Sequence, residues 1–126
     1  MSPKLIYVSS PYSAPTQDER WGNVLTAIKA GIVIRLKGNF PVIPHLYDDF
    51  DEVAKALGIE FTWQDYIDMD TTFLSKCDAI LYLGSSKGAD IELSVARDMK
   101  IPIYYSVDEV PEFKPFVASS FKDSSY

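Results

Sequence analysis

The sequence predicts an α/β fold: a doubly wound, flavodoxin- or Rossmann-like parallel sheet of about four to five strands with helices on both faces. Short, almost continuous apolar runs alternate with longer amphipathic segments, and the connections between them are short. Strands that are apolar throughout are typical of a parallel sheet covered on both faces. The expected order is strand-helix-strand-helix-helix-strand-helix-strand. It brings the carboxyl ends of the strands to one edge, where ligands of such folds bind.

Each predicted element has its own local pattern. In chain order the elements are strand 5–8, helix 17–37, strand 40–43, helices 48–57 and 61–76, strand 79–83, helix 88–100 and strand 101–105. The strands are runs of apolar residues closed by Ser, Pro or Gly. The helices repeat apolar residues at three- and four-residue spacing, and Gly38 and Gly58 predict the ends of the first two.

We expect one domain, residues 1–126, with a core at about 5–105. The tail at 106–126 is expected to form at most a short helix at 115–121. The chain is 47% apolar and 24% charged, an ordinary globular balance that argues against wholesale disorder. The net charge of −6 argues against a nucleic-acid polymer as partner, because such binding depends on Lys and Arg neutralising phosphates. A small phosphorylated ligand is still compatible, since one local anion site does not need a basic protein.

Cysteine usage and hydropathy limit the class further. Cys77 is the single cysteine, which excludes an internal disulfide and a cysteine-rich metal cage, and we interpret it as a buried structural thiol. No apolar run approaches the ~20 residues that span a bilayer, and no secretory signal is evident. We therefore expect a cytoplasmic protein with no membrane partner.

Polar residues collect where three predicted strands end, at residues 7–13, 44–45 and 84–88. Ser86 and Gly88 fall at a helix start, where unpaired backbone N–H groups can bind an anion. The alternative is that Ser85 or Ser86 only caps the helix and that Gly88 only serves the turn.

Glu92 lies about one turn into the same helix. One interpretation is that its charge only complements the helix dipole. The other is a nucleophile, or a group that stabilises an oxocarbenium ion. On the residues alone both interpretations stay open.

The other candidate acid-base groups are aspartates and one histidine. Asp65 and Asp68 can share a helix face, and one carboxylate of this Asp-rich helix, which also carries Asp70, could pair with Glu92. Asp78, just before a strand, is expected to accept hydrogen bonds from backbone N–H groups. His45 is the single histidine, and it is either a loop residue at a strand end or a ligand contact.

Residues 84–88 also spell G-x-S-x-G between a strand and a helix, as in a nucleophile elbow. That catalytic triad needs a histidine after the serine, and none follows Ser86. We therefore reject a serine hydrolase. The dinucleotide and P-loop fingerprints are absent too.

Several patterns carry a family resemblance. They are Tyr7-x-Ser9-Ser10-Pro11-Tyr12, Arg20, Gly38 followed by Pro44-His45, Trp63, Asp70 followed by Cys77-Asp78, and Ser86-x-Gly88-Ala89-x-x-Glu92. Over about residues 5–105 their order and spacing resemble the nucleoside 2-deoxyribosyltransferase-like superfamily. The nearest members look to be small bacterial and phage-type proteins of unassigned role and the 2′-deoxynucleoside 5′-monophosphate N-glycosidases.

The resemblance implies a role for each matched residue. Glu92 would attack or stabilise C1′ of the sugar, Asp70 would assist proton transfer to the leaving base, and Tyr7 would lie beside them. A 5′-phosphate or 5′-hydroxyl would bind at Ser86 and the Gly88 backbone. The remaining substrate contacts would be Ser9, Ser10, Pro11 and Tyr12 in the cleft wall, and His45 and Trp63 at the base.

Two departures from the resembled families concern the substrate. Ser86 stands where the deoxyribosyltransferases commonly have Asp, six positions before the catalytic Glu, and serine there favours a phosphorylated substrate. The Gly-rich, Arg-containing first loop of the glycosidases is replaced by Ser-Ser-Pro-Tyr-Ser, so that Arg20 or Lys87 would have to supply the positive charge.

The expected function is therefore cleavage or transfer at the N-glycosidic bond of a nucleoside or (deoxy)nucleoside 5′-monophosphate, with no metal or cofactor. Because members of the resembled family form dimers, and because Phe61, Trp63 and Tyr66 are expected to form an apolar surface beside the acidic helix, we also expect a homo-oligomer. The alternatives are a nucleotide-binding module without turnover and a structural domain whose polar edge only caps helices.

Overall fold

The computed structural model describes residues 2–114 of the 126-residue chain. Its sheet has four strands, all paired in parallel: β1 (Leu5–Ser9), β2 (Phe40–Val42), β3 (Ala79–Tyr82) and β4 (Ile103–Tyr104). They lie in the order β2-β1-β3-β4. The predicted doubly wound parallel sheet is thereby confirmed.

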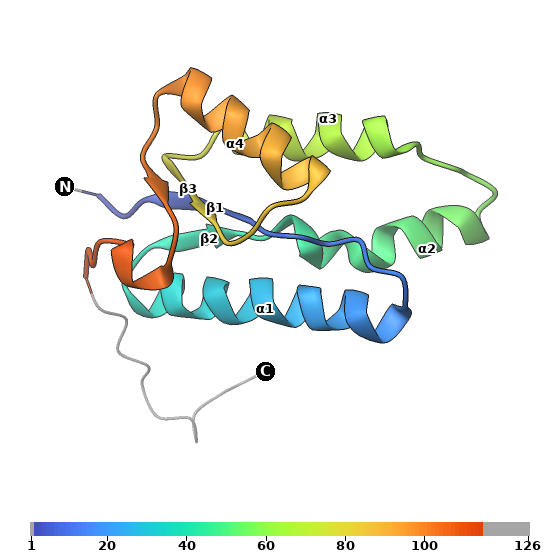
Figure 1. Ribbon diagram of the computed structural model, residues 1–126, viewed down its shortest axis with the longest axis horizontal. Coiled ribbons are helices and arrows are strands. Elements are labelled where there is room, and N and C mark those ends of the chain that lie inside the picture. The colour runs from blue at the N-terminus through green and yellow to red at the C-terminus, as the bar shows by residue number, and fades with distance from the viewer. Residues whose placement is uncertain (1, 115–126) are drawn as a thin grey trace.

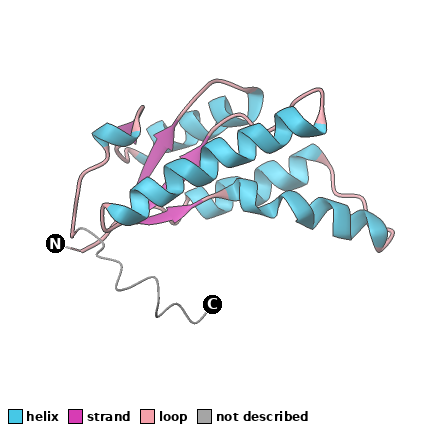
Figure 2. Ribbon diagram, turned by 90° about the horizontal axis from the view of Figure 1, so that it is seen from below, coloured by secondary structure: helices cyan, strands magenta, loops and turns pink. Residues whose placement is uncertain are grey.

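Helices cover both faces of this sheet (Figures 1 and 2). The α-helices are α1 (Gln17–Leu36), α2 (Asp48–Ala56), α3 (Trp63–Leu74) and α4 (Lys87–Met99), and the 3-10 helices are η1 (Pro44–Tyr47) and η2 (Val107–Glu109). One core joins β1 and β3 to α1, and a second joins them to α3 and α4.

The two cores use alternate residues of β1, because successive strand side chains point to opposite faces. Ile6 and Val8 belong to the α1 core, whereas Tyr7 belongs to the core beneath α3 and α4. Ser9 has the same parity as Tyr7. The polar groups of β1 are therefore directed toward α4.

The strand order reverses at β1. The chain passes from β1 to β2 on one side, and β3 pairs with β1 on the other. Ligands of doubly wound folds bind outside the carboxyl ends of the strands at such a switch point. The segments after β1 and β3 therefore define the edge at which to search for a site.

Most predicted element boundaries differ from the observed ones by only one or two residues, and local chemistry explains several differences. The helix predicted at 61–76 begins at Trp63 because Thr62 and Asp65 form a capping box. The strand predicted at 101–105 is limited to Ile103–Tyr104, after Pro102. Pro44 and His45 do more than end a strand, since they open η1. The helix predicted at 115–121 lies outside the described residues.

Two structural roles predicted from the sequence are confirmed. Cys77 is buried, and burial raises the pKa of its thiol to about 11. Asp78 accepts a hydrogen bond from the backbone N–H of Leu5 at 2.8 Å, which ties the segment before β3 to the start of β1. Within residues 2–114, no helix combines the length and apolar character needed to cross a membrane.

Candidate active site

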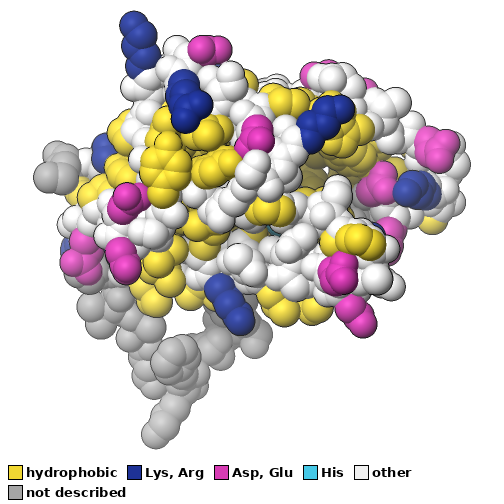
Figure 3. Space-filling view, in the orientation of Figure 1, with side chains coloured by type: hydrophobic (Ala, Val, Ile, Leu, Met, Phe, Trp, Pro, Cys, Tyr) yellow, Lys and Arg dark blue, Asp and Glu magenta, His cyan; other side chains and the backbone are white. Residues whose placement is uncertain are grey.

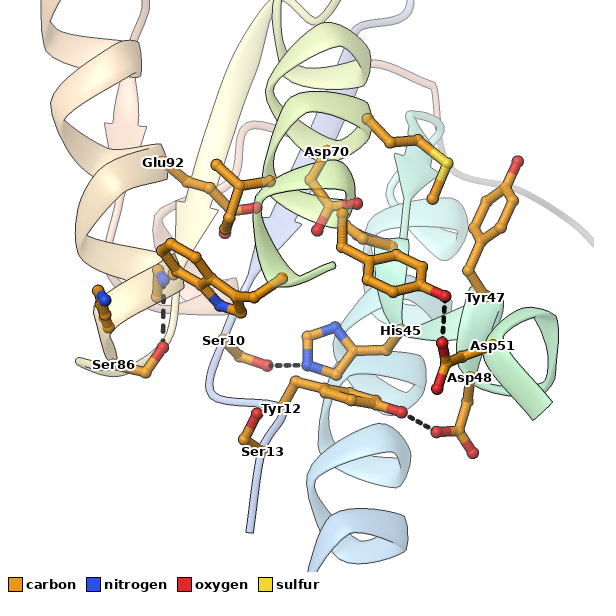
Figure 4. Close-up of a pocket in the computed structure, with 18 residues that line it drawn as sticks. Ser10, Tyr12, Ser13, His45, Tyr47, Asp48, Asp51, Asp70, Ser86 and Glu92 are labelled. Carbon is orange, nitrogen blue, oxygen red and sulfur yellow. Dashed lines mark hydrogen bonds between the residues drawn. The ribbon is translucent and has the colours of Figure 1, made fainter. Parts of the chain in front are cut away.

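A cavity of about 380 Å³ opens at the predicted edge of the sheet (Figure 4). Side chains from the loop after β1, from η1 and from helices α2, α3 and α4 form its wall. The lining residues are Ser10, Tyr12, Ser13, Pro44, His45, Tyr47, Asp48, Asp51, Trp63, Tyr66, Ile67, Met69, Asp70, Ser86, Lys87, Gly88, Ala89 and Glu92. Glu92 and Asp70, the two carboxylates singled out from the sequence, share this cavity.

Two residues of β1 hold the side chain of Glu92 in place. Its side chain is 6% exposed, and the hydroxyl of Tyr7 donates to Oε2 while the hydroxyl of Ser9 donates to Oε1 at 2.9 Å. Both donors have the strand parity that faces α4, which is why two alternate residues reach one carboxylate. The result is a carboxylate of fixed orientation at the pocket floor.

The electrostatics distinguish the two carboxyl groups. Burial, together with the negative charge of Glu92, raises the pKa of Asp70 from 3.8 to about 7. Burial also raises the pKa of Glu92, but the hydrogen bonds from Tyr7 and Ser9 oppose that rise. Near neutral pH, Asp70 can therefore carry a proton while Glu92 is ionised.

Asp70 is part of one lining face of α3. Trp63, Tyr66, Ile67 and Asp70 follow at positions i, i+3, i+4 and i+7, and all four line the cavity. The other two aspartates of α3 do not line the cavity: Asp65 belongs to the capping box, and Asp68 accepts a hydrogen bond from Nε2 of Gln64 at 2.8 Å. This face gives the pocket an aromatic wall beside a carboxyl group.

The start of α4 forms the mouth of the pocket. Ser86 is the N-cap, and its hydroxyl accepts a hydrogen bond from the backbone N–H of Ala89 at 3.1 Å, so the capping interpretation is correct. Because Ser86 and Gly88 also line the cavity, capping does not exclude ligand contact. The ammonium of Lys87 lies 4.4 Å from the ring centroid of Trp63, a cation–π contact that joins α4 to α3.

At the opposite end of the pocket two tyrosines are anchored to the first turns of α2 (Figure 4). The hydroxyl of Tyr12 donates to Asp48, and that of Tyr66 donates to Asp51 at 2.5 Å. These bonds fix the tyrosine rings as walls. Acidic and basic side chains are scattered over the face seen in Figure 3, at both of its ends, between apolar side chains.

His45 lies in η1, is buried and lines the cavity. Its Nε2–H donates to the carbonyl oxygen of Pro11 at 3.1 Å, because a carbonyl can only accept. Burial lowers the pKa of the imidazole, which keeps the ring neutral. Its Nδ1 has no hydrogen-bond partner among residues 2–114.

Four residues expected at the site are not on the cavity wall. Tyr7 and Ser9 lie beneath Glu92, because β1 buries them under α4. Pro11 has turned toward Gly84, where its ring would lie within 3.4 Å of an added Cβ. Arg20, one of the two candidates for the positive charge, pairs with Asp48 at 3.6 Å and lines a neighbouring depression of about 250 Å³, whereas the other candidate, Lys87, lines the main cavity.

The pocket also contains residues that sequence reasoning missed. The most prominent are Tyr47, Asp48, Asp51, Tyr66, Ile67 and Met69. Tyr66 and Ile67 had a readable signal, because they share the helix face of Trp63 and Asp70. Asp48 and Asp51 had none, since their place depends on how α2 packs.

In the described part of the chain, no three His, Cys, Asp or Glu side chains are arranged to hold a metal ion. The fold and the pocket define a parallel α/β protein with a two-carboxylate site at the topological switch point of its sheet. Residues 4–106 match the model of the family described as Domain of unknown function (DUF7768), and the chain belongs to that family. No curated protein matches the chain.

Proposed function

We propose that this protein cleaves, or exchanges the base at, the N-glycosidic bond of a nucleoside or (deoxy)nucleoside 5′-monophosphate. The observation that carries the proposal is the buried carboxylate of Glu92, held by Tyr7 and Ser9 in the same pocket as Asp70. Breaking this bond builds positive charge at C1′, which a preorganised carboxylate stabilises.

The two carboxyl groups suit the two halves of the reaction. As the C1′–N bond breaks, its electron pair goes to the base nitrogen, and the proton of Asp70 transfers to the base. The carboxylate of Glu92 forms a bond to C1′, or stabilises the cation there. Water then bonds to C1′ and gives a proton to the Asp70 carboxylate, while any Glu92–C1′ bond breaks and its electron pair returns to the Glu92 carboxylate, which is hydrolysis. In transfer, a second base bonds to C1′ in place of water and gives its N–H proton to Asp70. The proposal invokes no cofactor.

The aromatic side chains of the pocket wall are suited to stack against a flat nucleobase as the leaving group. Tyr12, Tyr47 and Tyr66 supply aromatic surface on the α2 side of the pocket, and Trp63 adds an aromatic ring beside Lys87. Lys87 and the N-terminus of α4 lie where a 5′-phosphate or 5′-hydroxyl would bind. Substrates of this kind occur in the cytoplasm, which is the location we propose.

Base release tests the proposal. The full chain is incubated with ribo- and 2′-deoxynucleosides and their 5′-monophosphates, and free base is measured by chromatography. We expect release from at least one member, reduced more than about 1000-fold in Glu92→Gln. Asp98→Asn, on the exposed side of the same helix, is the control and should retain activity. If the wild type releases no base from any member, the proposal fails and a binding module without turnover becomes the better description.

We also propose that the protein is a homo-oligomer. Leu46, Phe50, Val53 and Leu57 form an exposed stripe with four-, three- and four-residue spacing along η1 and α2. The opposite side of α2 carries Asp48, which lines the pocket. Exposed stripes of this spacing are typical of helix–helix contacts. Sedimentation should detect a dimer or larger assembly at micromolar concentration, weakened by Val53→Glu; a wild-type monomer would contradict the proposal.

A further inference from the structure

Ser9 has an unusual place for a residue next to a pocket. It is 1% exposed and is not among the residues that line the cavity. Its hydroxyl, the one polar group of its side chain, donates to Oε1 of Glu92 at 2.9 Å. A buried serine in this position has no contact with solvent and cannot touch a substrate without a rearrangement. It acts on the site through Glu92.

The two carboxyl groups of the pocket differ in their donors. Glu92 has one donor on each oxygen, Ser9 on Oε1 and Tyr7 on Oε2. Among residues 2–114, Asp70 receives no hydrogen bond and no ion pair, although it is partly buried and within the field of Glu92. Two nearby carboxyl groups disfavour double ionisation, and hydrogen bonds to a charged form stabilise it. The arrangement therefore favours a negative charge on Glu92.

We propose that Ser9 is a positioning residue that acts with Tyr7 to keep the negative charge of this carboxyl pair on Glu92, which leaves the shared proton on Asp70. The two hydrogen bonds to Glu92 favour the negative charge there whether or not the protein has a substrate. Its consequence for catalysis rests on the proposed function, because that function needs an ionised Glu92 and an acid at Asp70.

The surrounding groups do not provide an alternative control of this charge. The titratable and charged groups near the pair are Tyr7 on β1, His45 on η1, Asp48 and Asp51 on α2, Cys77 after α3 and Lys87 on α4. Tyr7 keeps its proton, since burial and Glu92 raise its pKa far above the ordinary value. His45 is neutral because burial lowers its pKa. Of these groups, Tyr7 alone is hydrogen-bonded to Glu92. The second donor to Glu92 is the hydroxyl of Ser9.

The experiment is a side-chain carboxyl titration of the full-length, ¹³C-labelled chain by NMR. Glu92→Gln and Asp70→Asn assign the two signals. In the wild type we expect Glu92 to titrate below Asp70. Ser9→Ala should raise the Glu92 midpoint by about one pH unit, the size expected for one hydrogen bond to a charged group. Ser9→Cys keeps the shape of the side chain and a weak donor. Its Glu92 midpoint should therefore lie between those of the wild type and Ser9→Ala.

Ser10→Ala is the matched control, because this neighbouring buried hydroxyl lies by His45 at 3.4 Å rather than by Glu92. A Glu92 midpoint that moves no more in Ser9→Ala than in Ser10→Ala overturns the proposal. If Ser9→Ala does not fold, Ser9→Cys carries the same comparison. Where base release is observed, the acidic limb of its kcat profile should move to higher pH in Ser9→Ala while KM stays within about twofold. If the wild type releases no base, the proposed function fails, and the titration still decides the role of Ser9.

Discussion

The hydroxyl of Tyr7 donates a hydrogen bond to Glu92, a residue 85 positions later in the chain. Tyr7 is fully buried at the centre of the sheet, paired with Val42 on one side and Ile80 on the other. The strand β1 is paired with a neighbouring strand on each side. The contact therefore ties the orientation of the candidate catalytic carboxylate directly to the core.

Tyr7→Phe should destabilise the protein by about 2 kcal/mol at pH 8, because it leaves a buried, ionised Glu92 short of one donor. The Tyr7 bond lowers the pKa of Glu92, so its stabilisation is present at high pH and is lost as the pH falls and Glu92 is protonated. Urea unfolding at pH 8 and pH 4.5 measures the difference. Tyr104→Phe, at a partly buried tyrosine away from the pocket, is the control, and an equal loss at both pH values would contradict the assignment.

Local patterns were sufficient to predict much of the fold. Apolar runs predicted the strands, and the pair Ser85-Ser86 before an amphipathic segment indicated a helix cap, which the structure assigns to Ser86. Spacing within one helix also related Ser86 to Glu92. These features need no knowledge of how helices and strands pack.

Tertiary packing decided the rest of the site. The contact of Ser9 with Glu92 requires that α4 cross the face of β1 on which Ser9 lies. No local sequence pattern encodes that crossing. Arg20 was a candidate for a phosphate contact, but in the structure it pairs with Asp48 of α2 and lies outside the main cavity. Residues whose role depends on a partner from a distant segment were the ones that sequence reasoning misplaced or missed.

Asp70→Asn should stabilise the protein at alkaline pH. The folded state raises the pKa of Asp70 from 3.8 to about 7, so the stability linked to its proton is present below pH 4 and is lost as the pH rises through 7. Asparagine does not ionise, so the variant does not lose this stability as the pH rises. We expect a gain of about 1 to 2 kcal/mol at pH 8 and little change at pH 4.5, a value reduced for the partial exposure of the carboxyl group.

Denaturant unfolding across this pH range measures the effect. Asp68→Asn, at an exposed position of the same helix, is the control and should leave the pH dependence of the wild type unchanged. If Asp70→Asn is no more stable than the wild type at pH 8, the proton assigned to Asp70 is absent.

Lys87→Met should distinguish a phosphorylated substrate from a free nucleoside. Within the described part of the chain, Lys87 is the single lysine or arginine on the pocket wall. Methionine keeps an apolar chain beside Trp63 but removes the charge. We expect KM for a 5′-monophosphate to rise about tenfold, with KM for the nucleoside unchanged.

Arg20→Met provides the comparison, because Arg20 lies off the main cavity and should not discriminate between the two substrates. The readout is initial rates of base release for a nucleoside and its monophosphate. If Lys87→Met raises KM equally for both substrates, Lys87 does not recognise the phosphate and only shapes the entrance of the pocket.

Two glycines of the α1 region should respond to alanine in opposite directions. Gly38 follows α1 with a φ of +91°, and a Cβ there would lie 1.9 Å from the carbonyl oxygen of Lys114. That segment is already held to the end of α1 by the hydrogen bond from the N–H of Phe113 to the carbonyl of Lys37 at 2.9 Å. Gly38→Ala should therefore destabilise the protein by more than about 2 kcal/mol, from backbone strain and the displaced contact.

Gly22, inside α1, has no atom within 4 Å of an added Cβ. Gly22→Ala should stabilise by about 0.5 to 1 kcal/mol, because alanine lowers the entropy of the unfolded chain in a helical position. Urea unfolding of the two variants measures both changes. Neither glycine lines the cavity, so any base release per folded molecule should be the same in both. A Gly38→Ala variant as stable as the wild type would mean that the chain around Lys114 does not close over the end of α1.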